Sequence, residues 1–519
     1  MLKDRAWAAF DRAEKHLPGE DLAPARRRLE EIRQGFETRL RVALVGRVSS
    51  GKSTLVNALL EEERVPTGVT ELTFHVTRLR RAERESLTVH YRDGRPSRRR
   101  GVDEFRELVV QAHHDPARQA ELRAVDWLDL DLPSAALARF DLVDTPGLDS
   151  WLGEDSARTL RFLGRTGADV ADATVEHASR ADALVLVFAS GLAESEERLL
   201  EDVTGAGLRR VEPLTAVGAL TKVEYYWPYC ADPMAEGRRI ADRLMHHSGG
   251  HRTMFELVPV AGQLATGATA GTAQDVADLT ELAQVAPSLL ATRVSRGPFF
   301  VSRDYADLPV PARRREALFR RYGGYGIVLA CDLVREGLTD RDELLAELRR
   351  RSGVEHLREL LLEHFGNRVT AVKLDRAVHE AHALPALAAA DADAWVRWRL
   401  EEAAEEVTRL RLTEHVFQEL TLLRRIYDGS LACTPDEVAE VLRVTGEKGD
   451  APAQRLGLAE NSGTDTLVRT ALRRQAYWAG VDLDVARGPE VAEAARTVRR
   501  SYDLLLDRIQ GAREERKEP

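Results

Sequence analysis

The sequence predicts an α/β domain with a doubly wound, mixed β-sheet, followed by an all-α helical bundle. From about residue 40 to 270, short apolar runs such as "RVALVG" and "LTAVGALTK" alternate with helix-like stretches, as strands and helices do around such a sheet. The near-continuous apolar run at 181–189 is typical of a strand covered on both faces. Beyond about residue 285 the strand pattern stops, and apolar residues recur at helical spacing instead.

The length of 519 residues is enough for two or three domains. We expect N-terminal helices over residues 1–38 that pack with the bundle, an α/β domain over 39–275, and the helical bundle over 285–515. The boundary is placed where "ATGATAGTA" and "RGPFF" accumulate small residues and proline, because such segments suit a hinge.

Composition argues against several classes of protein. The net charge of −10 disfavours a general nucleic-acid binder, so no nucleic-acid partner is expected. Cys230, Cys331 and Cys433 are too few and too widely spaced to predict a disulfide framework or a metal cluster. The N-terminus has no apolar segment of the signal-peptide kind, and no apolar run approaches the length of a membrane span. We therefore expect a cytoplasmic protein that meets the inner face of the cell membrane only peripherally.

The most specific motif follows the first predicted strand. "GRVSSGKS" matches the G-x-x-x-x-G-K-[S/T] phosphate-binding loop and opens a helix-like run. Glycines let backbone N–H groups surround a β-phosphate, and the helix N-terminus adds partial positive charge. We expect Lys52 to bridge the β- and γ-phosphate oxygens and the Ser53 hydroxyl to bind Mg²⁺. The residues expected to bind nucleotide here are Gly46, Arg47, Val48, Ser49, Ser50, Gly51, Lys52, Ser53 and Thr54.

A second motif, "DTPG", ends another predicted strand. Asp144 is expected to hold Mg²⁺ through water, and the backbone N–H of Gly147 to contact a γ-phosphate. The next residue is Leu148, where Ras-like proteins carry a glutamine that positions water. Another group must therefore orient the attacking water.

A threonine that closes over Mg²⁺ and the γ-phosphate is expected between these two motifs, in "VPTGVTELT". Thr70 and Thr73 are both candidates, and Thr70 is favoured as the metal ligand. The alternative for each is a threonine that simply enters the next strand.

"GALTKVEYYW" carries the candidate base-reading loop. Its Thr221, Lys222 and Glu224 follow the N/T-K-x-D pattern of guanine-nucleotide proteins, except that glutamate replaces aspartate. The carboxylate would accept hydrogen bonds from guanine N1–H and the 2-amino group, which adenine cannot donate. The longer side chain must withdraw by about one methylene, so we expect a preference for GTP over ATP with reduced affinity or selectivity. A backbone N–H near Ala261, in "VPVAG", is expected to contact guanine O6.

Together these residues resemble the dynamin superfamily, and the bacterial dynamin-like GTPases of the actinobacterial isoniazid-inducible type in particular. The resemblance is carried by "GRVSSGKST", with Ser49 at the fourth position, by "PTGVTELT" and "DTPG", and by the long insert between them. The helical C-terminal half is similar more loosely, in "LFRRYGGYGIVLACDLVREG" and "AQRLGL". The fold that this implies is an α/β P-loop GTPase domain with a helical-bundle neck or stalk.

The resemblance also implies a mechanism. In that family GTP-bound G domains form a homodimer across the nucleotide face. Lys52, Ser49 and the switch threonine, Thr70 or Thr73, would then act in hydrolysis of GTP to GDP with Mg²⁺, often with a bound monovalent cation. Stalk motion would do mechanical work on membrane lipid, and a second dynamin-like protein is a further expected partner.

Two alternatives to this mechanism stay open. The chain could be a nucleotide-regulated scaffold that partners a membrane-anchored dynamin-like protein with little turnover of its own. It could also act on a target other than a membrane. The substitution at Glu224 favours the scaffold, whereas intact Lys52, Ser53 and Asp144 favour the enzyme.

Four further features receive a plainer interpretation. The cluster "HHSGGH" (246–251) is expected to be a solvated turn and not a metal site, and "RPSRRRG" (95–101) an exposed loop. Trp395 and Trp398 are expected to pack in the bundle core, with a membrane-contacting tip as the alternative. Tyr225, Tyr226 and Trp227 are expected to cover the base pocket or a domain interface.

Overall fold

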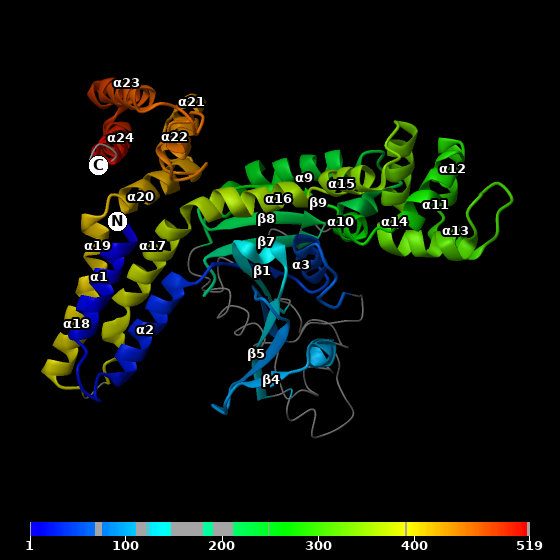
Figure 1. The fold of residues 1–519 in the computed structure, drawn as a ribbon. Coiled ribbons are helices and arrows are strands. Elements are labelled where there is room, and N and C mark those ends of the chain that lie inside the picture. Colours follow the sequence, from blue (N-terminus) through cyan, green and yellow to red (C-terminus); the bar gives the residue numbers. More distant parts are fainter. Residues whose placement is uncertain are drawn as a thin grey trace. The chain divides into compact units, whose positions relative to one another are not determined.

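The computed structural model describes residues 2–67, 75–110, 122, 124–146, 180–189, 211–247, 249–389 and 392–515. The chain divides into two compact units (Figure 1). We call Arg41–Leu360 the sheet unit, and Met1–Leu40 together with Leu361–Pro519 the helical unit. The predicted fold class, an α/β domain with a mixed sheet plus an all-α part, is confirmed.

The described strands of the sheet unit form one sheet in the order β4-β3-β5-β2-β6-β1-β7-β8-β9. β1, β7, β8 and β9 run parallel, whereas β2 is antiparallel to β6, and β3 is antiparallel to β4 and β5. The strands are β1 Leu40–Gly46, β2 Val76–Arg81, β3 Ser86–Tyr91, β4 Arg98–Arg100, β5 Val125–Leu132, β6 Phe140–Asp144, β7 Ala183–Ala189, β8 Ala216–Thr221 and β9 Leu257–Val260.

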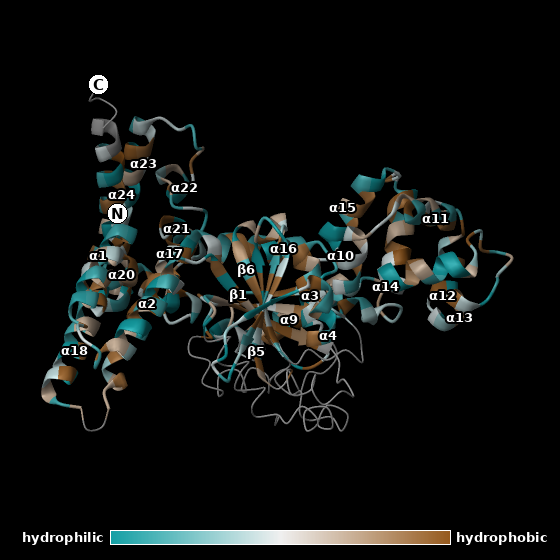
Figure 2. Ribbon diagram, turned by 60° about the horizontal axis from the view of Figure 1, so that its bottom comes forward, coloured by the Kyte–Doolittle hydropathy of each residue, from teal (hydrophilic) through white to brown (hydrophobic). Residues whose placement is uncertain are grey.

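The parallel half of the sheet is apolar along its whole length. Every residue of β8 is buried, and β1 and β7 are buried except at single positions. Strands of this kind are covered on both faces, which explains their continuous runs of Val, Leu and Ala. Figure 2 shows the strands as an apolar centre within this unit. The carboxyl ends of β1, β7, β8 and β9 consequently share one edge, where the loops of interest begin.

The other half of the sheet has one charged face. The Arg78 guanidinium donates both to Asp129 Oδ1 and to Oδ2 across the β2–β5 pair, each at 2.8 Å. Arg80 Nε donates to Asp131 Oδ1 across the same pair of strands, at 2.9 Å. Position 95–101, expected to be a loop, includes the short strand β4 at the sheet edge.

The predicted boundary at 275–285 falls inside the sheet unit, which extends to Leu360. The physical reason is a shared core, because Leu264, Tyr322 and Ile327 belong to the same buried cluster as the central strands. Gly267 also lies so close to the Arg321 carbonyl that no side chain would fit between them. The helices of this unit are α3 Lys52–Leu60, α4 Phe105–Val110, α9 Pro233–His247, α10 Gly262–Thr269, α11 Ala273–Ala283, α12 Pro287–Val294, α13 Gly297–Ser302, α14 Ala312–Arg335, α15 Arg341–Arg351 and α16 Val354–Leu360.

The helical unit is built from both ends of the chain. Its helices are α1 Leu2–Lys15, α2 Ala23–Glu37, α17 Val369–His382, α18 Ala394–Thr408, α19 Leu410–Thr413, α20 Val416–Tyr427, α21 Pro435–Val444, α22 Pro452–Arg455, α23 Thr464–Leu483 and α24 Pro489–Glu515. α1, α2, α17 and α18 share one buried core, to which Phe10, Leu29 and Leu374 contribute. Among the helices with described positions, none combines the length and the apolar character needed to cross a bilayer.

Trp395 and Trp398 correct the prediction that they pack in the bundle core. Their exposed fractions are 47% and 48%, and nearby Leu387 is 48% exposed. The reason is the phase of α18, which buries Leu400, Ala403, Ala404 and Val407. Residues 395 and 398 lie on another face of that helix, so the tryptophans remain accessible.

Candidate functional site

The loops that carry the predicted motifs lie at the carboxyl ends of neighbouring strands. The phosphate loop follows β1, the D-T-P segment follows β6, and the base-reading loop follows β8. In open α/β sheets, ligands bind in the crevice outside these strand ends. The topology therefore brings together segments that are far apart in the sequence.

The backbone of the phosphate loop has the special conformations that its glycines predict. Gly51 has φ +91°, and Ser49 has φ +58°, a left-handed conformation that is uncommon for serine. A side chain at Gly46 would collide with the Val187 carbonyl of β7. At Gly51 it would come to 3.3 Å from Thr221 Oγ1. The loop is thus packed tightly between β7 and the base-reading loop.

Lys52, the first residue of α3, points its side chain back into the phosphate loop. Its side chain is only 7% exposed. The Nζ group donates hydrogen bonds to the carbonyls of Gly46, at 3.0 Å, and Arg47, at 2.8 Å. The ammonium group therefore lies inside the loop, where a phosphate could exchange for these carbonyls.

Ser53 and Asp144, predicted from motifs 91 positions apart, meet directly. The Ser53 hydroxyl donates to Asp144 Oδ2 at 3.1 Å. Asp144 is fully buried, and its Oδ1 has no hydrogen-bond partner in the part of the chain that the structure describes. Burial raises the pKa of Asp144 to about 6, against the lowering effects of Lys52 and of the Ser53 hydroxyl. An unpaired buried carboxylate oxygen is costly unless a ligand completes it.

Thr145 fixes the turn that follows Asp144. Its hydroxyl donates to the Leu44 carbonyl of β1 at 2.6 Å, and the residue is fully buried. The other predicted residues around the γ-phosphate, Gly147, Thr70 and Thr73, lie outside the described residues. Their predicted roles stay predictions.

Thr221 links the base-reading loop to the phosphate loop. Its Oγ1 lies within hydrogen-bonding distance of the Ser50 carbonyl and, at 2.9 Å, of the Phe188 carbonyl. A hydroxyl has one proton and can donate to either carbonyl. The next residue, Lys222, has φ +61° and begins a short 3-10 turn that contains Glu224. One side chain thereby connects the ends of β7 and β8 with the phosphate loop.

Glu224 is buried, with 8% of its surface exposed. Its Oε1 accepts the backbone N–H of Gln263 at 3.0 Å, whereas Oε2 has no partner among the described residues. Burial raises the pKa of the Glu224 carboxyl, and the Gln263 N–H opposes that shift. Glu224 therefore has one oxygen bound to the protein and one oxygen without a partner.

The prediction for Ala261 needs correction. Its backbone N–H donates to the Ser352 carbonyl at 2.8 Å, and the residue is fully buried, so this group is not available to a base. Gly262 ends the predicted "VPVAG" segment, but nothing in the sequence singled out Gln263, and these two are the first residues of α10. The sequence signal that could have identified them is the start of a helix immediately after "VPVA". The first N–H groups of a helix lack acceptors within the helix, so they can bind other groups.

The other charged clusters do not form a comparable site. The described residues contain no group of three side chains that could hold a metal ion. His251 Nδ1 lies 3.0 Å from the Met245 carbonyl, consistent with an ordinary turn. The three described cysteines are free thiols.

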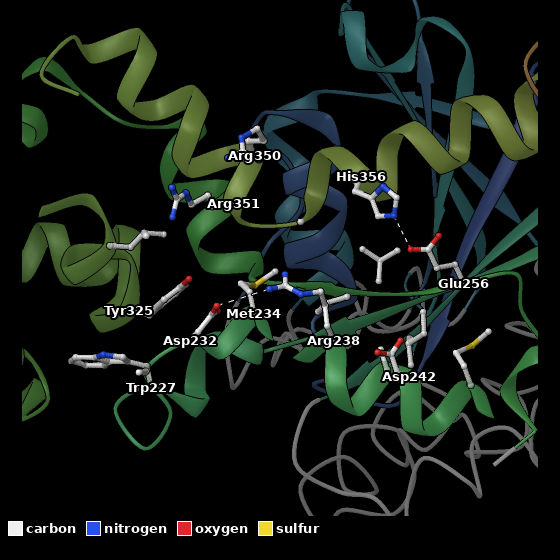
Figure 3. Close-up of a pocket in the computed structure, with 18 of the residues that line it drawn as sticks. Trp227, Asp232, Met234, Arg238, Asp242, Glu256, Tyr325, Arg350, Arg351 and His356 are labelled. Atoms are coloured by element: carbon white, nitrogen blue, oxygen red, sulfur yellow. Dashed lines mark hydrogen bonds and ion pairs between the residues drawn. The ribbon is translucent and has the colours of Figure 1, made fainter. Parts of the chain in front are cut away.

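A separate pocket of about 820 Å³ lies beside β9, between α9, α14 and the α15–α16 turn (Figure 3). Its walls combine Trp227 and Tyr325 with several charged side chains. These charges are largely paired, since Glu256 contacts His356 at 2.7 Å and Arg350 contacts Glu347 at 2.6 Å. Trp227 and Tyr226 pack against the core of the sheet unit.

Comparison with known proteins shows which families and proteins the chain resembles. Residues 42–204 match the family model described as Dynamin family. The isoniazid-induced protein IniC of Mycobacterium tuberculosis is 28% identical over 488 residues, which cover 92% of this chain and 92% of that protein. Dynamin-like protein 2 of Campylobacter jejuni is 33% identical over 122 residues, covering 24% of this chain and 19% of that protein.

Among solved structures, a chain from an oligomerised bacterial dynamin pair covers 95% of this chain and 88% of its own length. The identity is 12% and the TM-score is 0.29, which is too low to support any argument. The motif geometry, the family match and the near full-length similarity to IniC lead to one assignment. The chain resembles the bacterial dynamin-like proteins, and the segment that matches the dynamin family lies in the sheet unit.

Proposed function

We propose that the sheet unit binds GTP with Mg²⁺ and hydrolyses it to GDP and phosphate, and that this turnover serves work at a membrane surface. The observation that carries the proposal is the meeting of Ser53 and Asp144 at 3.1 Å, beside the buried Lys52. A hydroxyl and a carboxylate next to a phosphate loop are the oxygen ligands that a Mg²⁺–nucleotide complex requires.

The side chains of Ser53 and Asp144 are suited to binding Mg²⁺. Asp144 is buried, and one of its oxygens lacks a partner among the described residues. Ser53 would bind the ion directly and Asp144 through water, with Thr70 as the proposed third ligand. Bound there, Mg²⁺ supplies positive charge to the β- and γ-phosphate oxygens. Lys52 would give up its loop carbonyls and donate to the same phosphates.

In the proposed hydrolysis, water forms a bond to the γ-phosphorus while the bond to the bridging β–γ oxygen breaks, giving GDP and phosphate. Ser49 is the candidate for orienting that water, together with Thr70 or Thr73. Strained backbone is typical of functional sites, and the left-handed φ of Ser49 supports this role. A monovalent cation and a second G domain across the nucleotide face are proposed to complete the site.

Dimerisation can be tested without measuring turnover. Light scattering should give the mass of a monomer with GDP and of a dimer with GDP, Mg²⁺ and aluminium fluoride. The Ser49→Ala variant should dimerise less if that loop forms part of the interface. A monomer under every nucleotide condition would argue against the G-domain dimer.

Phosphate release tests the enzyme directly. Lys52→Ala should reduce GTP turnover at least about 100-fold, because it removes the charge that stabilises the transferred phosphate. Lys448→Ala, at an exposed lysine of the helical unit, is the matched control and should turn over GTP like the unaltered protein. Each protein should be assayed with and without liposomes.

The same assay separates the enzyme from the scaffold. If Lys52→Ala and the unaltered protein release phosphate at the same rate under every condition, hydrolysis is disproved. Nucleotide binding that depends on Lys52 would then support a nucleotide-regulated scaffold. The paired Ser53 and Asp144 favour the enzyme.

Membrane contact is proposed for the tip formed by Leu387, Trp395 and Trp398. Tryptophan and arginine together suit the interface between water and lipid. Arg399 lies over both tryptophan rings, at 5.9 Å from Trp395 and 5.5 Å from Trp398. This geometry supports a peripheral contact with lipid, in keeping with the exposure of the two rings.

A further inference from the structure

We infer that Thr77 is a positioning residue of the Mg²⁺ site: its hydroxyl and Asp144 Oδ1 together hold a water molecule that the ion uses as a ligand. The inference rests on the proposed function, because it concerns the metal of the same nucleotide site. Thr77 is not among the residues that the sequence motifs identify. It acts through this water and does not touch the nucleotide.

The pairing of two strands places Thr77 beside Asp144. The two residues lie directly opposite each other across the antiparallel β2–β6 pair. Directly opposite residues of such a pair point to the same face of the sheet, with Cβ atoms about 4.5–5.5 Å apart. Asp144 identifies that face, because its Oδ2 accepts the Ser53 hydroxyl of α3 at 3.1 Å. The Thr77 side chain therefore points to the face that carries the start of α3.

The next residue of β2 gives the same orientation independently. Arg78 donates to both carboxylate oxygens of Asp129, at 2.8 Å each, on the charged face of the sheet. Successive side chains of a strand point to opposite faces. Thr77 therefore points away from the charged face, as does the fully buried Leu79 two residues later.

Thr77 and Asp144 each have a buried polar atom without a partner. Both residues are fully buried. Neither Thr77 Oγ1 nor Asp144 Oδ1 has a hydrogen-bond partner in the part of the chain that the structure describes, so they do not bond to each other either. An unpaired polar atom in a protein interior is costly. Two such atoms at paired positions, next to a hydroxyl that is suited to Mg²⁺, indicate that one further group completes both.

A water molecule bound to Mg²⁺ fits these two atoms. Mg²⁺ usually keeps several of its waters when a protein binds it. A water whose oxygen is bound to the ion has two protons to donate, and Asp144 Oδ1 and Thr77 Oγ1 can each accept one of them. Asp144 thereby holds the ion through water, and Thr77 fixes where that water lies.

Binding of a fluorescent GTP analogue with an imido bridge between its β- and γ-phosphates tests the inference without turnover. The full-length protein is titrated in Mg²⁺ and again in EDTA. Loss of a group that orients a metal ligand commonly costs about 10–100-fold in metal affinity, so Thr77→Val should weaken binding in Mg²⁺ roughly tenfold and binding in EDTA less than about twofold. Thr77→Ser keeps the hydroxyl and should bind in Mg²⁺ within about threefold of the unaltered protein.

Stability without nucleotide gives a second readout. The Thr77 hydroxyl has no partner within the described ranges, so its replacement by a methyl group should leave the urea midpoint of the nucleotide-free protein unchanged or raise it. A hydroxyl that stabilised the fold itself would lower the midpoint when removed. Thr88→Val is the matched control, because Thr88 lies in β3 opposite Asp129 of the charged face. It should leave the effect of Mg²⁺ on binding unchanged.

Two results would overturn the inference alone: Thr77→Val binding as tightly as the unaltered protein in Mg²⁺, or losing as much affinity in EDTA as in Mg²⁺. In both cases Mg²⁺ still strengthens Lys52-dependent binding by the unaltered protein, so the proposed function stands. If Mg²⁺ has no effect on binding by the unaltered protein, the proposed metal site fails together with the inference. Thr77→Ala provides the same comparison if circular dichroism shows that Thr77→Val does not fold.

Discussion

At the scale of single residues, Thr221 determines how the two loops of the nucleotide site are held together. Thr221→Val keeps the shape of the side chain but leaves the Ser50 and Phe188 carbonyls without its proton. We expect a loss of about 1–2 kcal/mol in the free energy of unfolding, because a buried acceptor becomes unpaired. Urea unfolding measures the loss, and GTP affinity should fall severalfold because Ser50 belongs to the phosphate loop.

Thr269→Val is the matched control for that substitution. Thr269 donates to the Ala265 carbonyl within its own helix, at 3.1 Å, and links no two loops. It should lower stability slightly and leave GTP affinity unchanged. Equal losses of affinity in both variants would contradict a specific role for Thr221.

Glu437 determines a pH dependence of stability in the helical unit. Arg487 donates to both carboxylate oxygens, and the Thr434 backbone N–H and the Tyr477 hydroxyl donate as well. These groups lower the pKa of Glu437 to about 2, against the raising effect of burial. The folded pKa lies below the ordinary value, so the stabilisation is complete above pH 4.5 and is lost as pH falls toward 2.

Glu437→Gln should consequently cost about 2–3 kcal/mol at pH 7, and this cost should shrink between pH 4.5 and pH 2. Urea unfolding of both proteins across this range measures it. Glu490→Gln serves as the control, because Glu490 pairs with Arg425 at the surface and should cost less than about 0.5 kcal/mol. A cost for Glu437→Gln that does not depend on pH would contradict the assignment.

At the residue level, the motifs identify segments that the structure brings together, whereas the roles of their side chains stay predictions. The structure brings Ser53 and Asp144 together as the two motifs predict, because each motif terminates a strand of the same sheet. The prediction that the Ala261 N–H contacts a base was wrong, because this N–H donates to the Ser352 carbonyl. Ser352 directly follows α15, and the sequence gives no reason to place that helix beside Ala261. The hydrogen bond from the Gln263 N–H to Glu224 also depends on how the helices pack against the sheet, so it could not be predicted from the sequence either.

At the scale of elements, α14 is important because it is bent where it meets Gln263. Gly323 has φ +68°, and an added Cβ would lie 2.8 Å from Gln263 Oε1. Gly323→Ala should therefore cost about 1–3 kcal/mol in the free energy of unfolding and displace Gln263. GTP affinity should fall with it, which equilibrium binding measures.

Gly337→Ala separates this contact from backbone strain alone. Gly337 has φ +106° and open space around its Cβ position. Its substitution should lower stability through strain but leave nucleotide affinity unchanged. If Gly337→Ala weakens GTP binding as much as Gly323→Ala does, the kink of α14 has no specific effect on the base-reading loop.

The strands that the sequence did not predict share a charged face. In β5, "VDWLDLDL" buries Leu128, Leu130 and Leu132, while Asp129 and Asp131 bond to arginines of β2. Charged residues interrupt the apolar ones in both strands, so neither strand has the continuous apolar run that marks the parallel strands. The parallel strands were predictable because burial on both faces leaves a continuous apolar run.

At the scale of the whole molecule, the accessible tryptophans of the helical unit predict how the chain meets lipid. The double variant Trp395→Ser and Trp398→Ser removes two interfacial rings whose exposed fractions are 47% and 48%. We expect its co-sedimentation with anionic liposomes to fall at least about fivefold, while GTP turnover without liposomes stays unchanged.

Leu412→Ser is the control for this experiment. Leu412 is also in the helical unit and is 84% exposed, but it lies in α19, after the C-terminal end of α18, whereas Trp395 and Trp398 lie near the N-terminal end of α18. It should not alter liposome binding. Liposome binding unchanged in the double variant would exclude this tip as the contact, and no liposome binding by the unaltered protein would favour a non-membrane target.

The division into units could be predicted only in part. The sequence showed where strands end, and an α/β part with an all-α part is what the structure contains. It did not show that α11 to α15 share the core of the sheet, because their apolar faces have the same helical spacing whichever core they enter. Periodicity identifies a buried face, but not the surface that buries it.

The helical unit has a consequence for biosynthesis, because its core joins α1 and α2 to α17 and α18. α1 and α2 leave the ribosome well before α17, which begins only at Val369. At about 5–20 residues per second, their apolar faces wait roughly 20–70 seconds for the helices that cover them. During that interval the sheet unit can fold on its own contacts. A ribosome that stalls before α17 therefore leaves the apolar faces of α1 and α2 without the helices that cover them.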